Sequence, residues 1–166
     1  MTADDEVCIR SAQEGDLPII YSMIEDLADH LGLAHEVVVS EEDLQQALFG
    51  KQPRAEVVLA LVAGEAAGFA LFYGNYSTFR GQCGLHLEDL YVEPQWRGYG
   101  LGRRLLSYLA GLTISRGCRR LEWWVQTTDS RAVRFYEMLD AKAKDEWTVY
   151  RLAGEPLQRL AEAPRK

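Results

Sequence analysis

The feature that most constrains the fold is a strand, a glycine-rich turn and a helix between residues 85 and 112. Apolar and aromatic side chains from Leu85 to Val92 are typical of a strand. Pro94 ends ladder pairing there because proline has no N–H to donate. Glycine then occupies every second position from Gly98 to Gly102, and leucines recur at helical spacing from Leu101 to Leu112. The sequence therefore predicts a strand that leads into a long helix through a tight turn.

Such a turn is suited to binding an anion. The first N–H groups of a helix have no partner within the helix, and the helix dipole places partial positive charge there. Alternating glycines let the backbone approach a bulky phosphate because no Cβ intervenes. Arg97, Arg103 and Arg104 add cationic donors. We infer a pyrophosphate ligand held by Arg97, Gly98, Tyr99, Gly100, Leu101, Gly102 and Arg103.

Two common phosphate motifs do not fit this turn. A P-loop has Lys followed by Ser or Thr after its second glycine, whereas Arg103-Arg104 follows here. A dinucleotide fingerprint spaces its last two glycines by two residues and opens the first strand–helix unit of the chain. Here the glycines alternate and come after at least two earlier strands. For the glycine pattern alone, a tight turn before an ordinary helix is the alternative interpretation.

Length and charge limit the classes of protein. A chain of 166 residues is expected to form one domain. The net charge of −7 argues against a nucleic-acid partner, which needs a basic surface. No apolar run is long enough for a membrane span, and Asp4, Asp5 and Glu6 make the start unlike a signal peptide. We therefore expect a cytoplasmic protein with neither a nucleic-acid nor a membrane partner.

The three cysteines, Cys8, Cys83 and Cys118, are far apart in the sequence and lack metal-ligand spacing. We interpret them as free thiols in a reducing compartment. The three histidines have no spacing suited to a metal either, so no metal site is predicted.

Strand and helix patterns alternate along the chain, which predicts one α/β layered domain with a mixed sheet. Its core spans about residues 7–153, and residues 154–166 form a tail that is weakly specified from Pro156. The predicted strands are residues 7–11, 57–63, 66–76, 85–92, 121–125 and 148–152. A hairpin turn is predicted at Gly64-Glu65 and a polar loop from Ser77 to Gly84. The predicted helices are residues 17–31, 41–48 and 101–116, and one capped by Asp129 or Ser130 that runs to Leu139.

Several segments resemble one enzyme family. Arg97-x-x-Gly100-x-Gly102 after an apolar strand resembles the acetyl-CoA signature of the GNAT acetyltransferase superfamily. Val7 to Arg10 resembles that family's first strand, and Asp129-x-x-Ala132-x-x-Phe135-Tyr136 its penultimate segment. Leu87-Glu88-Asp89-Leu90-Tyr91-Val92, together with the glycine turn, is similar to the diamine (spermidine/spermine or thialysine) acetyltransferases. The resemblance covers nearly all of the chain from Val7 to Leu152.

The resemblance implies a GNAT-like fold, whose mixed, mostly antiparallel sheet is splayed at the middle strand and has helices on both faces. It implies acetyl-CoA as co-substrate, a small-molecule amine as acceptor and a homodimer. The backbone of Leu90, Tyr91 and Val92 would pair with the pantetheine arm and supply the oxyanion donors. Asp129 and Ala132 are further candidates for cofactor contact. Relatives often carry asparagine where Asp129 stands, and a carboxylate cannot donate a hydrogen bond.

The resemblance also implies two catalytic roles. Glu88 is the candidate base, acting through an ordered water, and a bulge in the middle strand is expected to turn both Glu88 and Asp89 toward the cleft. Tyr136 is the candidate acid, because a phenol is protonated at neutral pH and can donate to the leaving sulfur. A partly exposed structural carboxylate and a core aromatic are the respective alternatives. His86 near Glu88 is either a proton relay or an incidental strand histidine.

The substrate is the least constrained feature. Glu88, Asp89, Phe79 and His30 are candidate substrate-binding residues. Leu31 and Ser77 stand where polyamine-acetylating relatives carry acids, while Arg80 could meet a carboxylate, which favours a lysine-like amino acid. A non-catalytic acyl-CoA sensor and a GNAT enzyme for a protein or antibiotic amine are the alternatives in function.

Overall fold

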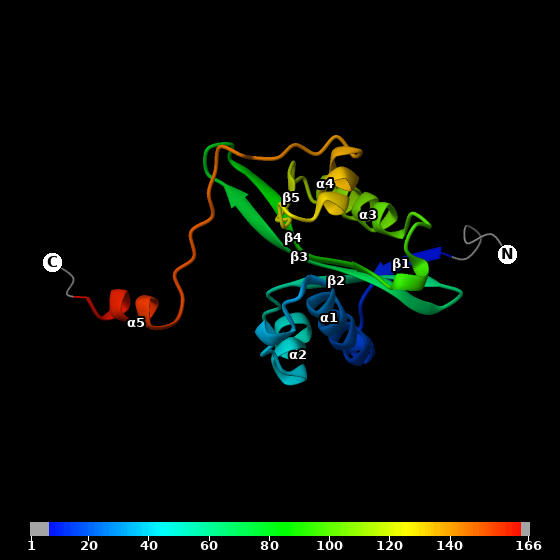
Figure 1. Cartoon of the computed structure of the whole chain (residues 1–166), viewed down its shortest axis with the longest axis horizontal. Helices are drawn as coiled ribbons and strands as arrows, with labels where there is room; N and C mark the ends of the chain where they lie inside the picture. The colour runs from blue at the N-terminus through cyan, green and yellow to red at the C-terminus, as the bar shows by residue number, and fades with distance from the viewer. Residues whose placement is uncertain (1–6, 164–166) are drawn as a thin grey trace. The chain divides into compact units, whose positions relative to one another are not determined.

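The computed structural model describes residues 7–163. Asp4, Asp5 and Glu6, which argued against a signal peptide, lie outside the described residues. The chain divides between Trp124 and Val125 into two compact units. Figure 1 shows the course of the chain through both units. No helix in residues 7–163 has the length and apolar character needed to cross a membrane.

The first unit contains a five-stranded sheet in the order β1-β2-β3-β4-β5. Its strands are β1 (Val7–Ser11), β2 (Glu56–Val62), β3 (Glu65–Ser77), β4 (Gln82–Val92) and β5 (Leu121–Trp123). Neighbouring strands from β1 to β4 are antiparallel, and β5 lies parallel to β4. This arrangement confirms the predicted mixed, mostly antiparallel sheet.

Helices cover both faces of this sheet (Figure 1). On one face, α1 (Leu17–Leu31) and α2 (Glu41–Phe49) share a core with Phe69 and Leu71 of β3. On the other face lies α3 (Leu101–Ser115), whose Leu101, Leu105 and Leu109 are buried. Successive strand residues point to opposite faces, so Phe72 lies on the α3 side, where the Arg116 guanidinium is 5.9 Å from its ring centroid.

Local chemistry explains where these helices begin and end. Ser40 Oγ accepts the N–H of Asp43 at 3.1 Å, and the Asp43 carboxylate accepts the N–H of Ser40, a reciprocal cap that starts α2. Gly32 ends α1 in the left-handed conformation, with φ 72°. Three short 3-10 helices complete the unit: η1 (Glu14–Asp16), η2 (Ala34–Glu36) and η3 (Pro94–Trp96).

Both hairpin turns differ from the predictions. The first turn is Ala63-Gly64, with φ of 51° and 84°, one residue earlier than expected because β3 already begins at Glu65. The second turn contains only residues 78–81, so the loop predicted to reach Gly84 is wrong. Gly84 pairs with Asn75 in the ladder, and a Cβ there would lie 2.5 Å from Asn75 Oδ1. A glycine that the sequence suggests is in a loop therefore lies in a strand, where its neighbours pack closely.

The second unit contains α4 (Ser130–Glu137) and α5 (Gly154–Glu162). The strand predicted for Thr148 to Leu152 is wrong, since no strand is found between Val125 and Ala163. Tyr150 is 93% exposed in this segment. A β-pattern forms a strand only where a neighbouring strand supplies hydrogen bonds. The tail predicted to be weakly specified instead forms α5.

The prediction that all three cysteines are free is also wrong. Cys83 and Cys118 form a disulfide with Cα atoms 4.7 Å apart, although 35 positions separate them in the sequence. The Arg119 N–H donates to the Cys83 carbonyl at 3.2 Å, so the chain leaving α3 runs alongside the beginning of β4. This tertiary pairing brings the two sulfur atoms together. Cys8 is the free cysteine of the described residues, and it is exposed.

Candidate functional site

The middle of β4 contains a β-bulge at Glu88. Leu71 of β3 pairs with Asp89, whereas the next residue, Phe72, pairs with Leu87. Glu88 is therefore the extra residue, without a ladder partner on β3. A bulge bends a strand and redirects its side chains, so the structure confirms the irregularity expected beside the two acids.

The ladder between β4 and β5 ends immediately beside this bulge. Their ladder contains three pairs and ends at Leu87 opposite Trp123, while β4 continues to Val92. The Glu93 N–H donates to the Ala67 carbonyl on β3. Backbone groups of successive strand residues point in alternate directions, so those of Tyr91 face β3, as in Glu93, and those of Leu90 and Val92 point away from it. The Val92 carbonyl accepts the Nε–H of Arg97 at 2.8 Å. The open edge of β4 therefore presents the N–H groups of Leu90 and Val92 and the carbonyl of Leu90, whereas the backbone of Tyr91 faces β3.

The Glu88 side chain is half-exposed and has two polar neighbours. Tyr73 Oη donates to Glu88 Oε2 at 3.3 Å, and His86 Nε2 lies 3.6 Å from the same oxygen. Tyr73 comes from β3, directly opposite His86 in the ladder. The sequence analysis missed Tyr73, because an aromatic in an apolar strand carries no local signal of a polar role. Only the register across the hairpin identifies it.

Asp89 has a different environment from its neighbour. Burial and the negative charge of Glu88 raise the pKa of the Asp89 carboxyl to about 6. A carboxyl with such a pKa is partly protonated near neutral pH. The bulge therefore places an exposed carboxylate next to a partly buried acid.

Asp89→Asn is expected to remove a pH dependence of stability. Because the pKa is higher in the folded chain than the ordinary 3.8, the folded state favours the protonated carboxyl, and stability falls as pH rises from about 4 to about 6. The loss is about 1–3 kcal/mol, at the lower end if water reaches the group. Urea unfolding at pH 4 and pH 8 should show the fall in the wild type and not in the variant. Asp29→Asn, at an exposed position of α1, is the control, and an equal pH response of wild type and Asp89→Asn would contradict the prediction.

The glycine turn has the conformation expected of an anion site. Gly98 and Gly100 are left-handed, with φ of 87° and 81°, and Gly100 is the N-cap of α3. The Gly100 carbonyl accepts the N–H of Arg104 at 3.0 Å. No side chain of the described residues caps this helix, so the amides of Leu101, Gly102 and Arg103 open the helix without a capping acceptor.

Two side chains of the turn, Arg97 and Tyr99, contact neighbouring residues. The Arg97 guanidinium lies 5.5 Å from the centroid of the Tyr91 ring, with its Nε–H on Val92 O. Tyr99 is exposed and packs edge-on against Trp96 at 6.3 Å between ring centroids. These contacts direct the Arg97 charge toward Tyr91 and the Val92 carbonyl.

In the second unit, Asp129 and Tyr136 are both positioned by α4. Asp129 Oδ1 accepts the N–H groups of Arg131 and Ala132 at 3.1 and 2.9 Å, so Asp129 rather than Ser130 is the N-cap. Tyr136 packs against Phe135 with ring centroids 5.2 Å apart. Burial, and then the charge of Asp129, raise the pKa of the Tyr136 phenol above its ordinary value. The phenol therefore keeps its proton at neutral pH.

Two predicted substrate residues lie outside the bulge. Phe79 is 94% exposed in the turn between β3 and β4. From Gln82, where β4 begins, the strand covers roughly 20 Å before Glu88, at about 3.3 Å per residue. His30 is exposed in the last turn of α1. Of the predicted substrate residues, the bulge brings together only Glu88 and Asp89.

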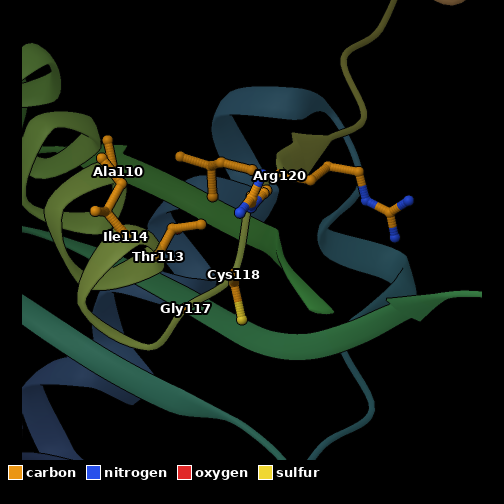
Figure 2. Close-up of a pocket in the computed structure, with 8 residues that line it drawn as sticks. Ala110, Thr113, Ile114, Gly117, Cys118 and Arg120 are labelled. Atoms are coloured by element: carbon orange, nitrogen blue, oxygen red, sulfur yellow. The ribbon is translucent and has the colours of Figure 1, made fainter. Parts of the chain in front are cut away.

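A hollow of about 470 Å³ lies elsewhere, at the C-terminal end of α3. Figure 2 shows Thr113, Ile114, Cys118 and Arg120 around it. Helix α3 is roughly 22 Å long, at 1.5 Å per residue. The hollow is therefore separated from the glycine turn at the other end of the helix and is not part of the anion site.

Comparison with known proteins identifies relatives over most of the chain. The family model described as "Acetyltransferase (GNAT) family" matches residues 21–140. A thialysine N-epsilon-acetyltransferase from Mus musculus is 35% identical over 164 residues, which cover 92% of this chain and 96% of the relative. An L-ornithine N5-acetyltransferase from Arabidopsis thaliana is 26% identical over 197 residues, covering 92% and 86%.

Solved structures show the same fold. An integron cassette protein from the mobile metagenome of V. cholerae superposes with a TM-score of 0.79 at 27% identity, covering 95% of this chain and 99% of that protein. A soil-metagenome aminoglycoside acetyltransferase in complex with sisomicin has a TM-score of 0.77 at 19% identity, covering 92% and 99%.

Proposed function

This chain belongs to the GNAT family of acetyltransferases, and we propose that it uses acetyl-CoA to acetylate a primary amine of a small molecule. Acetyl transfer to an amine is the activity of the family; the acetyl donor, the acceptor and the residue roles are our proposals. The bulge that frees Glu88 from the ladder, next to the point where the ladder between β4 and β5 ends, carries the proposal.

The residues available for acetyl-CoA fit its chemistry. The amides from Gly98 to Arg103 suit a pyrophosphate, because both left-handed glycines leave the backbone uncovered and no side chain of the described residues caps α3. The open edge of β4 at Leu90 and Val92 suits the amides of a pantetheine arm. Asp129 and Ala132 complete the proposed contacts. Bound acetyl-CoA supplies the acetyl group as a thioester.

Glu88 and Tyr136 would move the protons. The acceptor arrives as an ammonium ion, and Glu88 accepts its proton through an ordered water, which leaves a neutral amine able to attack. As the new carbon–nitrogen bond forms and the carbon–sulfur bond breaks, Tyr136 would donate its phenolic proton to the sulfur, and the second proton lost by the nitrogen would restore the phenol. The raised pKa of Tyr136 supports this role because the phenol remains protonated until needed. The N–H groups at the open edge of β4 would stabilise the negative charge that develops on the carbonyl oxygen.

A lysine-like amino acid is the acceptor that we favour over a polyamine. The thialysine and ornithine acetyltransferases named above are relatives by sequence. On this chain, the acids at the bulge are Glu88 and Asp89, which suit one terminal ammonium. Leu31 and Ser77 supply no further carboxylate for a second cation.

A thiol-release assay with acetyl-CoA and a panel of thialysine, lysine, ornithine and spermidine tests this proposal. We expect kcat/KM for thialysine to exceed that for spermidine by about tenfold or more, the size of one lost charged contact. A preference for spermidine would refute the amino-acid version. Binding of acetyl-CoA without thiol release from any amine would contradict the catalytic proposal and favour an acyl-CoA sensor.

The homodimer, the single acetyltransferase domain over residues 1–166 and the cytoplasmic location stay predictions. The dimer and the domain extent are supported by the resemblance to the diamine acetyltransferases.

A further inference from the structure

A buried histidine lies between two aromatic rings on the face of the sheet that carries Glu88. His86 is 7% exposed. Its ring stacks on Tyr73 of β3, with centroids 5.0 Å apart and planes at 29°, and meets Trp124 edge-on at 5.3 Å and 76°. Contacts on both sides therefore fix the imidazole, and its Nε2 atom is directed at the carboxylate of Glu88.

The polar atoms of both rings converge on one oxygen of Glu88. Tyr73 Oη lies 3.3 Å and His86 Nε2 lies 3.6 Å from Oε2. Within residues 7–163, both of these contacts of the Glu88 carboxylate involve Oε2, and neither involves Oε1. An exposed glutamate samples many rotamers, and holding one of its oxygens restricts that freedom. The bulge makes this convergence possible because it frees Glu88 from the regular alternation of β4.

We propose that Tyr73 and His86 are positioning residues, which hold Glu88 Oε2 so that Oε1 faces the water that takes the proton of the acceptor amine. This inference rests on the proposed role of Glu88 as base. Burial and the charge of Glu88 raise the pKa of Tyr73, so its hydroxyl stays a donor.

A purely structural role of Tyr73 would need only its ring, which packs on His86. The hydroxyl adds one contact, to Glu88, and Tyr73→Phe removes that contact while keeping the stack. Tyr76→Phe is a matched control on the same strand. Tyr76 is 64% exposed and lies three positions after Tyr73, so its side chain points to the opposite face of the sheet.

The experiment measures thiol release against pH for wild type, Tyr73→Phe, Tyr76→Phe, Glu88→Gln and the Tyr73→Phe/Glu88→Gln double variant. We expect Tyr73→Phe to lower kcat about tenfold, the size of one hydrogen bond to a charged group. Its KM for acetyl-CoA should stay unchanged. Tyr76→Phe should match the wild type.

The double variant distinguishes a failure of this inference from a failure of the proposed role of Glu88 as base. If Tyr73 acts through Glu88, Tyr73→Phe should have no further effect in the Glu88→Gln background. The inference is overturned if Tyr73→Phe lowers kcat equally in the wild-type and Glu88→Gln backgrounds, or if it does not lower kcat in the wild-type background. In either case, a large loss of kcat in Glu88→Gln alone still supports Glu88 as the base. A Glu88→Gln enzyme that keeps the wild-type kcat at neutral pH refutes the base itself, and the inference with it.

A pair of His86 variants tests the second positioning residue. His86→Gln retains an amide donor at about the position of Nε2, whereas His86→Leu retains only bulk. We expect the glutamine variant to keep most of the wild-type kcat and the leucine variant to lose about tenfold. Equal kcat values in the two variants would remove His86 from the inference. If neither variant folds, as judged by its thermal transition, the Tyr73 cycle decides the inference.

Discussion

Replacing Glu88 with glutamine is expected to lower kcat by about 10²-fold or more, within the usual range for loss of a general base. The amide has the shape of the carboxylate but cannot accept a proton from the ammonium group of the acceptor. Affinity for acetyl-CoA should be unchanged, because the proposed cofactor contacts lie at the glycine turn and the open edge of β4. Steady-state thiol release gives kcat, and calorimetry gives the affinity.

Alkaline pH provides a stringent check of the same variant. A lysine-like amine has a pKa near 10.4, so the fraction that is already deprotonated rises about tenfold per pH unit below that value. The rate of Glu88→Gln should therefore recover toward the wild-type rate as pH approaches 10. Glu65→Gln, at an exposed position where β3 begins, is the control for a lost surface charge. A loss of kcat that does not diminish at high pH would argue that Glu88 acts by some means other than proton acceptance.

Tyr136→Phe is the second variant with a large expected effect, a fall in kcat of about 10²-fold or more. The ring that packs on Phe135 is kept, and only the phenolic hydroxyl is lost. Without that hydroxyl, the thiolate must leave without a proton. The affinity for acetyl-CoA should match that of the wild type.

The pH profile distinguishes loss of an acid from general damage. Burial and Asp129 raise the pKa of Tyr136 above its ordinary value of 10, so the wild-type kcat should fall only above that pH as the phenol ionises. Tyr136→Phe should lack this basic limb. Tyr150→Phe is the matched control, since Tyr150 lies in the same unit and is 93% exposed. An unchanged kcat in Tyr136→Phe would remove this residue from the mechanism.

Elements with strong local signals were predicted well. Helix α1 follows from the apolar stripe that includes Ile20 and Ile24 and from the stop at Gly32, and α2 follows from the cap at Ser40. Caps and periodicity act within a few residues, so the sequence displays them directly. The segment from Thr148 to Leu152 has a strand pattern of similar clarity, yet it forms no strand. A strand depends on a partner that the local sequence does not specify.

The sequence by itself determined the glycine turn, the helix that it opens, the family, and Glu88 and Tyr136 as candidates for proton transfer. The turn and the helix follow from residue types at short, fixed spacings, and the two candidates follow from the resemblance to the family. Only the tertiary structure decided that Cys83 bonds Cys118 and that Tyr73 and His86 converge on Glu88. The disulfide follows from the return of the chain alongside β4 after α3, and the contacts of Glu88 follow from the register between β3 and β4 and from a one-residue bulge. Such contacts join residues distant in sequence, and shifting the register by one position would turn these side chains to the opposite face of the sheet.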